Sequence, residues 1–215
     1  MTFKLSPSSL NLFHECPRCF WLTQHAVWKR PAGIFPSLPS GMDGILKIHF
    51  DNFMRKGLLP PELKDNGDTK GMLLFDDEEL LKIWRSNFKG IQWEDTKGNI
   101  LRGAVDNILK KGKKLIVLDY KTRGYALKED THEHYQNQME IYNFLLRKNK
   151  HETEDYAFLL FYHPKEVKET GEVIFNTDLK KMKVNIKNAE KIWNTAIKML
   201  NEDCPKKSCD WCEGR

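Results

Sequence analysis

Two aspartates and a lysine lie close together in a part of the sequence that is rich in apolar and β-branched residues. Asp106 lies within the letters LRGAVDNIL, Asp119 follows the apolar run 115–118, and Lys121 comes two residues later. Residues two apart on a strand share one face, so Asp119 and Lys121 are expected to point the same way. A hairpin that turns at residues 111–112 would bring Asp106 beside them.

This set of residues could bind a metal ion and use it. Two close carboxylates repel each other when ionised, and a divalent cation removes that repulsion; oxygen ligands favour Mg²⁺ or Mn²⁺. Such an ion lowers the pKa of bound water and stabilises charge on a phosphoryl group, while Lys121 positions the nucleophile or offsets negative charge. The residues therefore fit phosphodiester hydrolysis. They also fit a simpler structure, in which Asp119 and Lys121 end a strand and Asp106 belongs to a turn.

The cysteines form a second group that could bind a metal. They lie only near the two ends of the chain, at Cys16, Cys19, Cys204, Cys209 and Cys212. Two C-x2-C pairs stand among them, and thiolates so spaced bind zinc or an iron–sulfur cluster in a reducing compartment. We therefore expect a cysteine-bound metal that joins residues 1–30 to residues 201–215. Unrelated buried thiols are the alternative.

The first third of the chain is predicted to be mainly helical. Ser6 followed by Pro7 is a helix-start signal, and the apolar residues Leu10, Phe13 and Phe20 continue from it. The glycine and prolines of residues 31–40 predict a break, after which GMDGILKIHFDNFMRKG resumes helical spacing. A loop is expected from residue 59 to about residue 69, and the letters ELLKIWRSNF predict a short helix.

The rest of the chain is predicted to alternate strands and helices. We expect three strands in an antiparallel meander up to Thr122, with the apolar run 115–118 as a central strand. The letters HYQNQMEIYNFLLRKN predict a helix, YAFLLFYHP and GEVIFNT two paired strands, and residues 179–201 a long helix. The order indicates an α/β protein with a mixed sheet, and we expect residues 1–215 to form a single domain.

Composition limits the classes of partner. The chain has a net charge of +5, which suits a nucleic-acid backbone but also suits many other proteins. No apolar run approaches the roughly 20 residues that a membrane span needs, so no membrane partner is expected. Met1 is followed by polar residues rather than a secretory signal. We therefore expect a cytoplasmic protein.

Several segments together resemble a known family. The letters GAVD, then VLDYKT, then Gln138 and Tyr142 four residues apart on a predicted helix, are similar to the motifs of RecB-like nucleases of the PD-(D/E)XK superfamily. The opening LSPSSLNLFHECPRCFWL resembles the first helix of these enzymes. The resemblance implies a restriction-endonuclease-like core and a metal-dependent DNA nuclease. We expect an exonuclease that acts on single-stranded DNA or DNA ends, in DNA repair, recombination or CRISPR spacer acquisition, with protein partners from a repair or CRISPR adaptation complex.

The resemblance also implies roles for individual residues. It makes Asp106 and Asp119 metal ligands, the Tyr120 carbonyl a further ligand and Lys121 the catalytic lysine. Gln138 and Tyr142 become groups that contact substrate or organise the site. The family often adds a histidine from an upstream helix, for which the candidate is His49, although the spacing in GMDGILKIH departs from the family pattern.

For the cysteines, the resemblance implies a [4Fe-4S] cluster of the kind found in AddB-type repair nucleases and in the iron–sulfur exonucleases of CRISPR adaptation. Those enzymes use one N-terminal and three C-terminal cysteines. This chain has an additional Cys19, so a two-plus-two zinc site is equally available. Cys16, Cys209 and Cys212 are ligands in either scheme, and the fourth is Cys204 or Cys19. The rival to a nuclease is a non-catalytic DNA-binding module with a structural metal, against which the intact set of two aspartates and a lysine argues.

Overall fold

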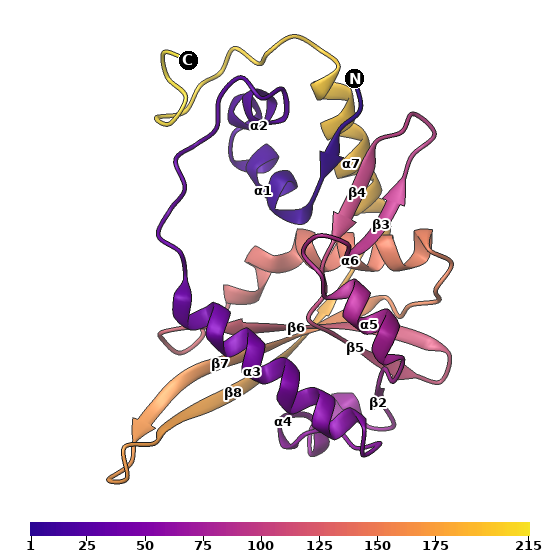
Figure 1. Cartoon of the computed structure of the whole chain (residues 1–215), viewed down its shortest axis with the longest axis vertical. Coiled ribbons are helices and arrows are strands. Elements are labelled where there is room, and N and C mark those ends of the chain that lie inside the picture. The colour runs from indigo at the N-terminus through magenta and orange to yellow at the C-terminus, as the bar shows by residue number, and fades with distance from the viewer.

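A five-stranded mixed sheet forms the centre of the computed structural model, which describes residues 1–215 (Figure 1). Its strands, in spatial order, are β2 (Leu73–Leu74), β5 (Asn107–Lys111), β6 (Lys114–Thr122), β7 (Tyr156–Val167) and β8 (Val173–Lys183). Strands β6 and β7 are parallel, whereas the other neighbours are antiparallel. The expected mixed sheet is therefore confirmed, and so is the central position of residues 115–118, which are all buried in β6.

A second, smaller sheet has the order β1 (Lys4–Leu5), β4 (Ile100–Gly103) and β3 (Ile91–Glu94). The predicted meander of three strands is thus wrong, because the segment forms four strands that are divided between two sheets. The chain leaves the small sheet after Gly103 and enters the large one at Asn107. Asp106 lies in this connection, one residue before β5, and not on a strand as expected.

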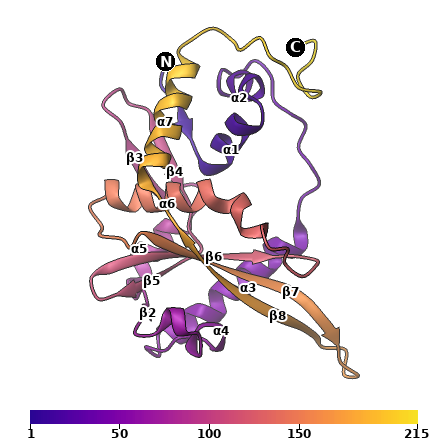
Figure 2. The same cartoon turned by 180° about the vertical axis from the view of Figure 1, so that it is seen from behind.

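Helices cover both faces of the large sheet (Figures 1 and 2). Helix α6 (Gln136–Lys148), preceded by the short 3-10 helix η2 (Thr131–Tyr135), lies on one face, and α3 (Ser37–Met54) and α4 (Pro61–Lys64) lie on the other. The strand alternation of β6 fits this arrangement. Asp119 is directed toward α6, whereas the ring of Tyr120 packs against Phe50 of α3 at 4.6 Å between centroids.

The two ends of the chain meet on the side of α6 that faces away from the large sheet. Helices α1 (Pro7–Glu15), α2 (Pro17–Gln24) and α7 (Ile186–Leu200) gather there with both termini (Figure 1). The predicted start of the first helix is confirmed, because Ser6 caps α1 and Pro7 occupies its first turn. Cys16 and Pro17 then divide the expected single helix into two, since Cys16 is extended and a proline follows it.

Three predicted boundaries differ from the structure. Helix α3 begins at Ser37, inside the expected break, and the expected loop 59–69 contains α4 and the 3-10 helix η1 (Gly67–Thr69). The last helix begins at Ile186, because residues 179–183 extend β8 in its pairing with β7. The helix predicted from ELLKIWRSNF is α5 (Glu78–Trp84). None of the helices is both long and apolar enough to cross a membrane.

Candidate active site and metal centre

Asp106 and Asp119 come together at the start of β5 and the end of β6. The antiparallel pairing of Asn107 with Leu118 sets the next residue on each side next to one another, and the Tyr120 amide donates a hydrogen bond of 2.9 Å to Asp106 Oδ2. Burial raises the pKa of the Asp106 carboxyl, and the charge of Asp119 raises it further. The structure therefore brings the two carboxylates into one site, as the hairpin predicts.

Lys121 is the cation nearest to Asp119. Its ammonium forms an ion pair with Asp119 Oδ2 and lies 4.7 Å from the ring centre of Tyr135. Burial opposes the charge of this lysine, but Asp119 outweighs burial, so the net result is a raised pKa. Asp119 is only 2% exposed, and the Lys121 ammonium is the only cation that the structure pairs with it. Two neighbouring carboxylates offer several oxygen ligands, so the donor set fits Mg²⁺ or Mn²⁺.

Gln138 and Tyr142 approach the same carboxylate from α6. Gln138 Nε2 lies 3.5 Å from Asp119 Oδ1 and donates a hydrogen bond of 2.7 Å to the Tyr142 hydroxyl. Burial, followed by the charge of Asp119, raises the pKa of Tyr142, so its hydroxyl stays protonated. The predicted helical spacing is confirmed, and both side chains belong to the site.

His49 does not reach the two aspartates. Its Nε2 atom lies 3.1 Å from Glu62 Oε1, and Glu62 also accepts a hydrogen bond of 3.0 Å from the Tyr162 hydroxyl. The side chain of α3 that does reach the site is Lys47, whose Nζ lies 3.3 Å from Asp106 Oδ1. Lys47 also pairs with Asp43, one helical turn earlier, at 2.7 Å. The site therefore holds two carboxylates and two lysines.

Sequence reasoning missed Lys47 and also Arg85, which fixes the connection that carries Asp106. Arg85 Nε donates a hydrogen bond of 2.7 Å to the Asp106 carbonyl, and its Nη1 binds both oxygens of Asp51 at 2.8 and 2.9 Å. The Asp43–Lys47 spacing was a usable signal, because residues four apart on a helix share a face. Arg85 had no such signal, since its partners lie 21 and 34 residues away.

Gly103 in the letters GAVD has a packing function. A Cβ atom at this position would lie 2.7 Å from Cε1 of Tyr142 and 3.0 Å from Leu145. We predict that Gly103→Ala displaces Tyr142 and lowers the free energy of unfolding by about 1–3 kcal/mol, as overpacking does. Urea denaturation tests this, with Gly112→Ala as a comparison that meets no neighbouring atom but is strained by its positive φ. Equal stability of Gly103→Ala and the wild type would contradict the packing argument.

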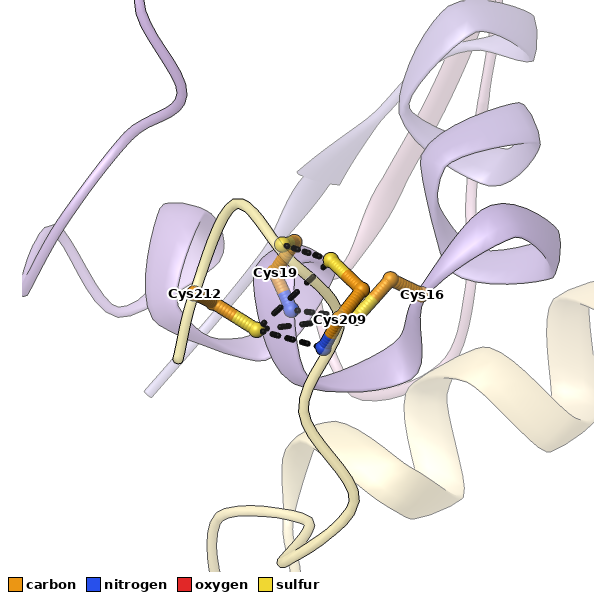
Figure 3. Close-up of side chains that lie close together, drawn as sticks. All are labelled: Cys16, Cys19, Cys209 and Cys212. Carbon is orange, nitrogen blue, oxygen red and sulfur yellow. Dashed lines mark hydrogen bonds between the residues drawn. The ribbon is translucent and has the colours of Figure 1, made fainter. Parts of the chain in front are cut away.

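Four cysteines from the two ends of the chain form a compact group (Figure 3). They are the members of the two C-x2-C pairs, Cys16, Cys19, Cys209 and Cys212, and their sulfur atoms all lie within 4.8 Å of one another. Individual Sγ–Sγ distances are 3.8 Å for Cys16–Cys212 and 3.5 Å for Cys19–Cys209. These are too long for disulfides, whose S–S bond is about 2.05 Å. The arrangement is consistent with a metal site built from two pairs.

The local structure turns these sulfurs inward. Cys16 ends α1 and caps α2, and its Sγ accepts a hydrogen bond from the Cys19 amide at 3.4 Å; Cys212 Sγ accepts one from the Cys209 amide at the same distance. At Cys209 burial is outweighed by hydrogen bonds from the Trp211 backbone and from Cys19, so its pKa falls to about 6. Cys209 is therefore readily available as a thiolate, the form that binds metals.

Arginines lie around this group. Arg30 Nη2 lies 3.7 Å from Cys209 Sγ, and a cation in this place offsets the negative charge of clustered thiolates. Cys204, the fifth cysteine, lies outside the group and accepts a hydrogen bond of 3.4 Å from Arg18. Of the two candidates for the fourth ligand, the structure therefore places Cys19 and not Cys204 with the other three.

A mixed sheet with two neighbouring aspartates and a lysine at the end of its central strand is typical of a class of metal-dependent nucleases. The family model for the PD-(D/E)XK nuclease superfamily matches residues 72–215, and the chain belongs to this superfamily. The D-x-K letters of the family name occur here as Asp119-Tyr120-Lys121, inside the matched range. Among curated proteins, none matches the chain. Nucleases of this superfamily use divalent metals and act on DNA.

Proposed function

We propose that this protein is a RecB-like DNA nuclease in which Asp106 and Asp119 hold a divalent cation. The observation that supports this most directly is the pairing of a buried carboxylate, Asp119, and a half-buried one, Asp106, with a lysine at the end of a central strand. The Tyr120 carbonyl is proposed as a further ligand. The chain is proposed to work as one domain, since a single core of 42 buried residues includes side chains from both sheets.

Each side chain has a proposed task in phosphodiester hydrolysis. A bound Mg²⁺ or Mn²⁺ would lower the pKa of water and offset charge on the phosphoryl group. Lys121 positions the attacking water and stabilises the negative charge that develops on the phosphate. Gln138 holds Asp119 in place, and Tyr142 holds Gln138. Lys47 lies beside Asp106 and is proposed to move to the phosphate once the carboxylate binds a cation.

The finer parts of the proposal concern substrate and setting. We propose an exonuclease that acts on single-stranded DNA or free ends in the cytoplasm, within DNA repair, recombination or CRISPR spacer acquisition. The resemblance of the first helix and of the segments GAVD and VLDYKT to RecB-like enzymes supports this. The rival function is DNA binding without cleavage, for which the basic net charge alone would suffice.

Cleavage of end-labelled DNA distinguishes the two functions. Anaerobically purified protein is incubated with labelled single-stranded, double-stranded and circular DNA in Mg²⁺, Mn²⁺ or EDTA. Products that require the metal support a nuclease, and resistance of the circular form supports an exonuclease. Retention of DNA by gel shift without products in any metal would support the rival.

We propose that the four grouped cysteines hold a single zinc ion rather than [4Fe-4S]. Tetrahedral zinc with Zn–S bonds of about 2.3 Å sets its sulfurs about 3.8 Å apart. The closest sulfurs here are separated by 3.5 to 3.8 Å. In a [4Fe-4S] cluster each of the four thiolates binds a different iron, which separates the cysteine sulfurs more widely. The group contains both C-x2-C pairs and leaves out Cys204, and this two-plus-two arrangement favours zinc.

Elemental analysis tests the metal assignment. We expect about one zinc per chain in colourless protein that has been purified without chelator or air. Stoichiometric iron with sulfide, and the broad visible absorption of an iron–sulfur cluster, would contradict zinc and support the cluster implied by the family resemblance. Absence of both metals would contradict any cysteine-bound metal.

A further inference from the structure

A cleft of about 330 Å³ lies beside the carboxylates, between α1, the strand β4 and α6. We call it the α1 cleft and define it by six of its lining side chains, Ser8, Asn11, Asn87, Arg102, Gln138 and Tyr142. Gln138 and Tyr142 belong to the candidate active site, whereas the other four have no part in the chemistry proposed above. The cleft is thus continuous with the site where the cut is proposed.

The lining suits an anion with polar substituents. Arg102 is its single cation, and no carboxylate lines it. Only one N–H group of Arg102 is used within the chain, in a 2.6 Å hydrogen bond from Nη1 to the Phe88 carbonyl. A guanidinium carries five N–H donors, so the remaining ones are free to bind phosphate oxygens.

Neutral donors surround this cation. Ser8 and Asn11 are three residues apart and share a face of α1, and Asn87 lines the same cleft. No hydrogen bond within the chain uses the side-chain amide of Asn11 or Asn87. The hydroxyl of buried Tyr142 accepts from Gln138, which leaves its proton for a ligand. Amides of this kind can bind sugar or base atoms as well as phosphate.

We propose that the α1 cleft binds the nucleotide next to the phosphodiester that is cut, with Arg102 on its phosphate. This inference rests on the proposed nuclease function and adds to it a binding subsite outside the carboxylate and lysine set. The substrate chemistry is that of a single strand, because the cleft has the volume of about one nucleotide and presents several polar donors to it. Arg102 binds and orients the strand, and the cut itself remains with the carboxylates and Lys121.

Steady-state kinetics on a labelled single-stranded oligonucleotide in Mn²⁺ test the proposal. Arg102→Gln is expected to raise KM about 10-fold with little change in kcat, which is the effect of losing one charged hydrogen bond. Asn87→Ala, at an exposed position, is expected to raise KM about threefold. The matched control is Lys97→Gln, which removes one positive charge from an exposed turn outside the cleft. Its KM is expected to stay within about twofold of the wild type.

A chemical change in the DNA gives a second readout. One neutral methylphosphonate is placed next to the cleavage position of the same oligonucleotide. It is expected to lower kcat/KM about 10-fold for the wild type and for Lys97→Gln, but to have no further effect on Arg102→Gln. The subsite would be overturned if the methylphosphonate lowered kcat/KM of Arg102→Gln by as much as it lowers that of the wild type. Equal KM values for folded Arg102→Gln and Lys97→Gln would also overturn it.

The outcome for the subsite can be distinguished from the outcome for the nuclease. If the wild type cuts nothing in any metal, the proposed function fails, and fluorescence anisotropy of the same oligonucleotide replaces kinetics. Weaker binding of Arg102→Gln than of Lys97→Gln, by about 10-fold, then retains the α1 cleft as a nucleotide site. Equal binding by the two variants rejects it.

Discussion

Asp119→Asn is expected to reduce DNA cleavage by about 10³-fold or more while DNA binding persists. The substitution keeps the shape of the side chain but removes the charge that is proposed to hold the cation. Metal ions contribute several kcal/mol to transition-state stabilisation, and each 1.36 kcal/mol corresponds to a tenfold change in rate. Binding is expected to persist because the Arg102 guanidinium in the α1 cleft is untouched. Single-turnover cleavage and anisotropy on the same DNA measure both quantities.

The matched control is Asp76→Asn, because Asp76 also pairs with a lysine but lies on the surface, 2.6 Å from Lys110. Its activity is expected to stay within about twofold of the wild type, as exposed ion pairs contribute little. Lys121→Met provides the complementary variant, which is expected to be equally inactive but to retain Mn²⁺ binding. Metal-dependent cleavage near the wild-type rate by Asp119→Asn, in protein free of contaminating nuclease, would show that the assigned site is wrong.

Cys212→Ser is expected to destabilise the protein far more than Cys204→Ser. Cys212 is fully buried in the four-cysteine group, whereas Cys204 lies outside it. Structural zinc contributes about 10–16 kcal/mol to the folding of small peptides, so loss of one ligand is expected to cost at least about 3 kcal/mol here. For a chain of this size that corresponds to a fall in Tm of about 10 °C. Differential scanning calorimetry measures the difference.

The loss of stability in Cys212→Ser is expected to be confined to one part of the chain. The tail after Asn201 buries only Cys212, whereas α1 and α2 place Leu10 and Phe20 in the main core. The first two helices can therefore dock without the cysteine group, whereas the tail is expected to depend on the proposed metal. Hydrogen exchange is expected to rise in residues 201–215 of Cys212→Ser and to remain slow in β6. Equal melting temperatures for Cys212→Ser and Cys204→Ser would contradict a metal at this group.

The parts of the site that lie close together in sequence were predictable. Asp119 and Lys121 share a strand, and Gln138 and Tyr142 share a helix face. The strand period of 2 residues and the helix period of 3.6 residues are therefore sufficient to place each pair on one face. Asp106 followed from the hairpin, although it lies just outside β5. The buried run 115–118 likewise indicated the central strand, because only a strand covered on both faces can be apolar throughout.

Features that depend on distant contacts were not predictable. The family resemblance makes His49 the candidate for an upstream ligand, but the direction in which α3 crosses the sheet decides that Lys47 meets Asp106. Spacing alone could not choose between Cys19 and Cys204, because that choice depends on how the tail folds back over α2. Residues 179–183 have helical spacing, yet pairing with β7 keeps them extended.

The position of the cysteine pairs along the chain has a consequence for synthesis. Cys19 and Cys209, whose sulfurs lie 3.5 Å apart, are separated by 190 residues. During translation the first pair therefore leaves the ribosome long before its partners exist, and two thiolates alone bind zinc incompletely. The carboxylate hairpin forms in the interval. A nascent chain would thus gain its fold around β6 first, and would complete the four-cysteine group only when Cys212 has been added.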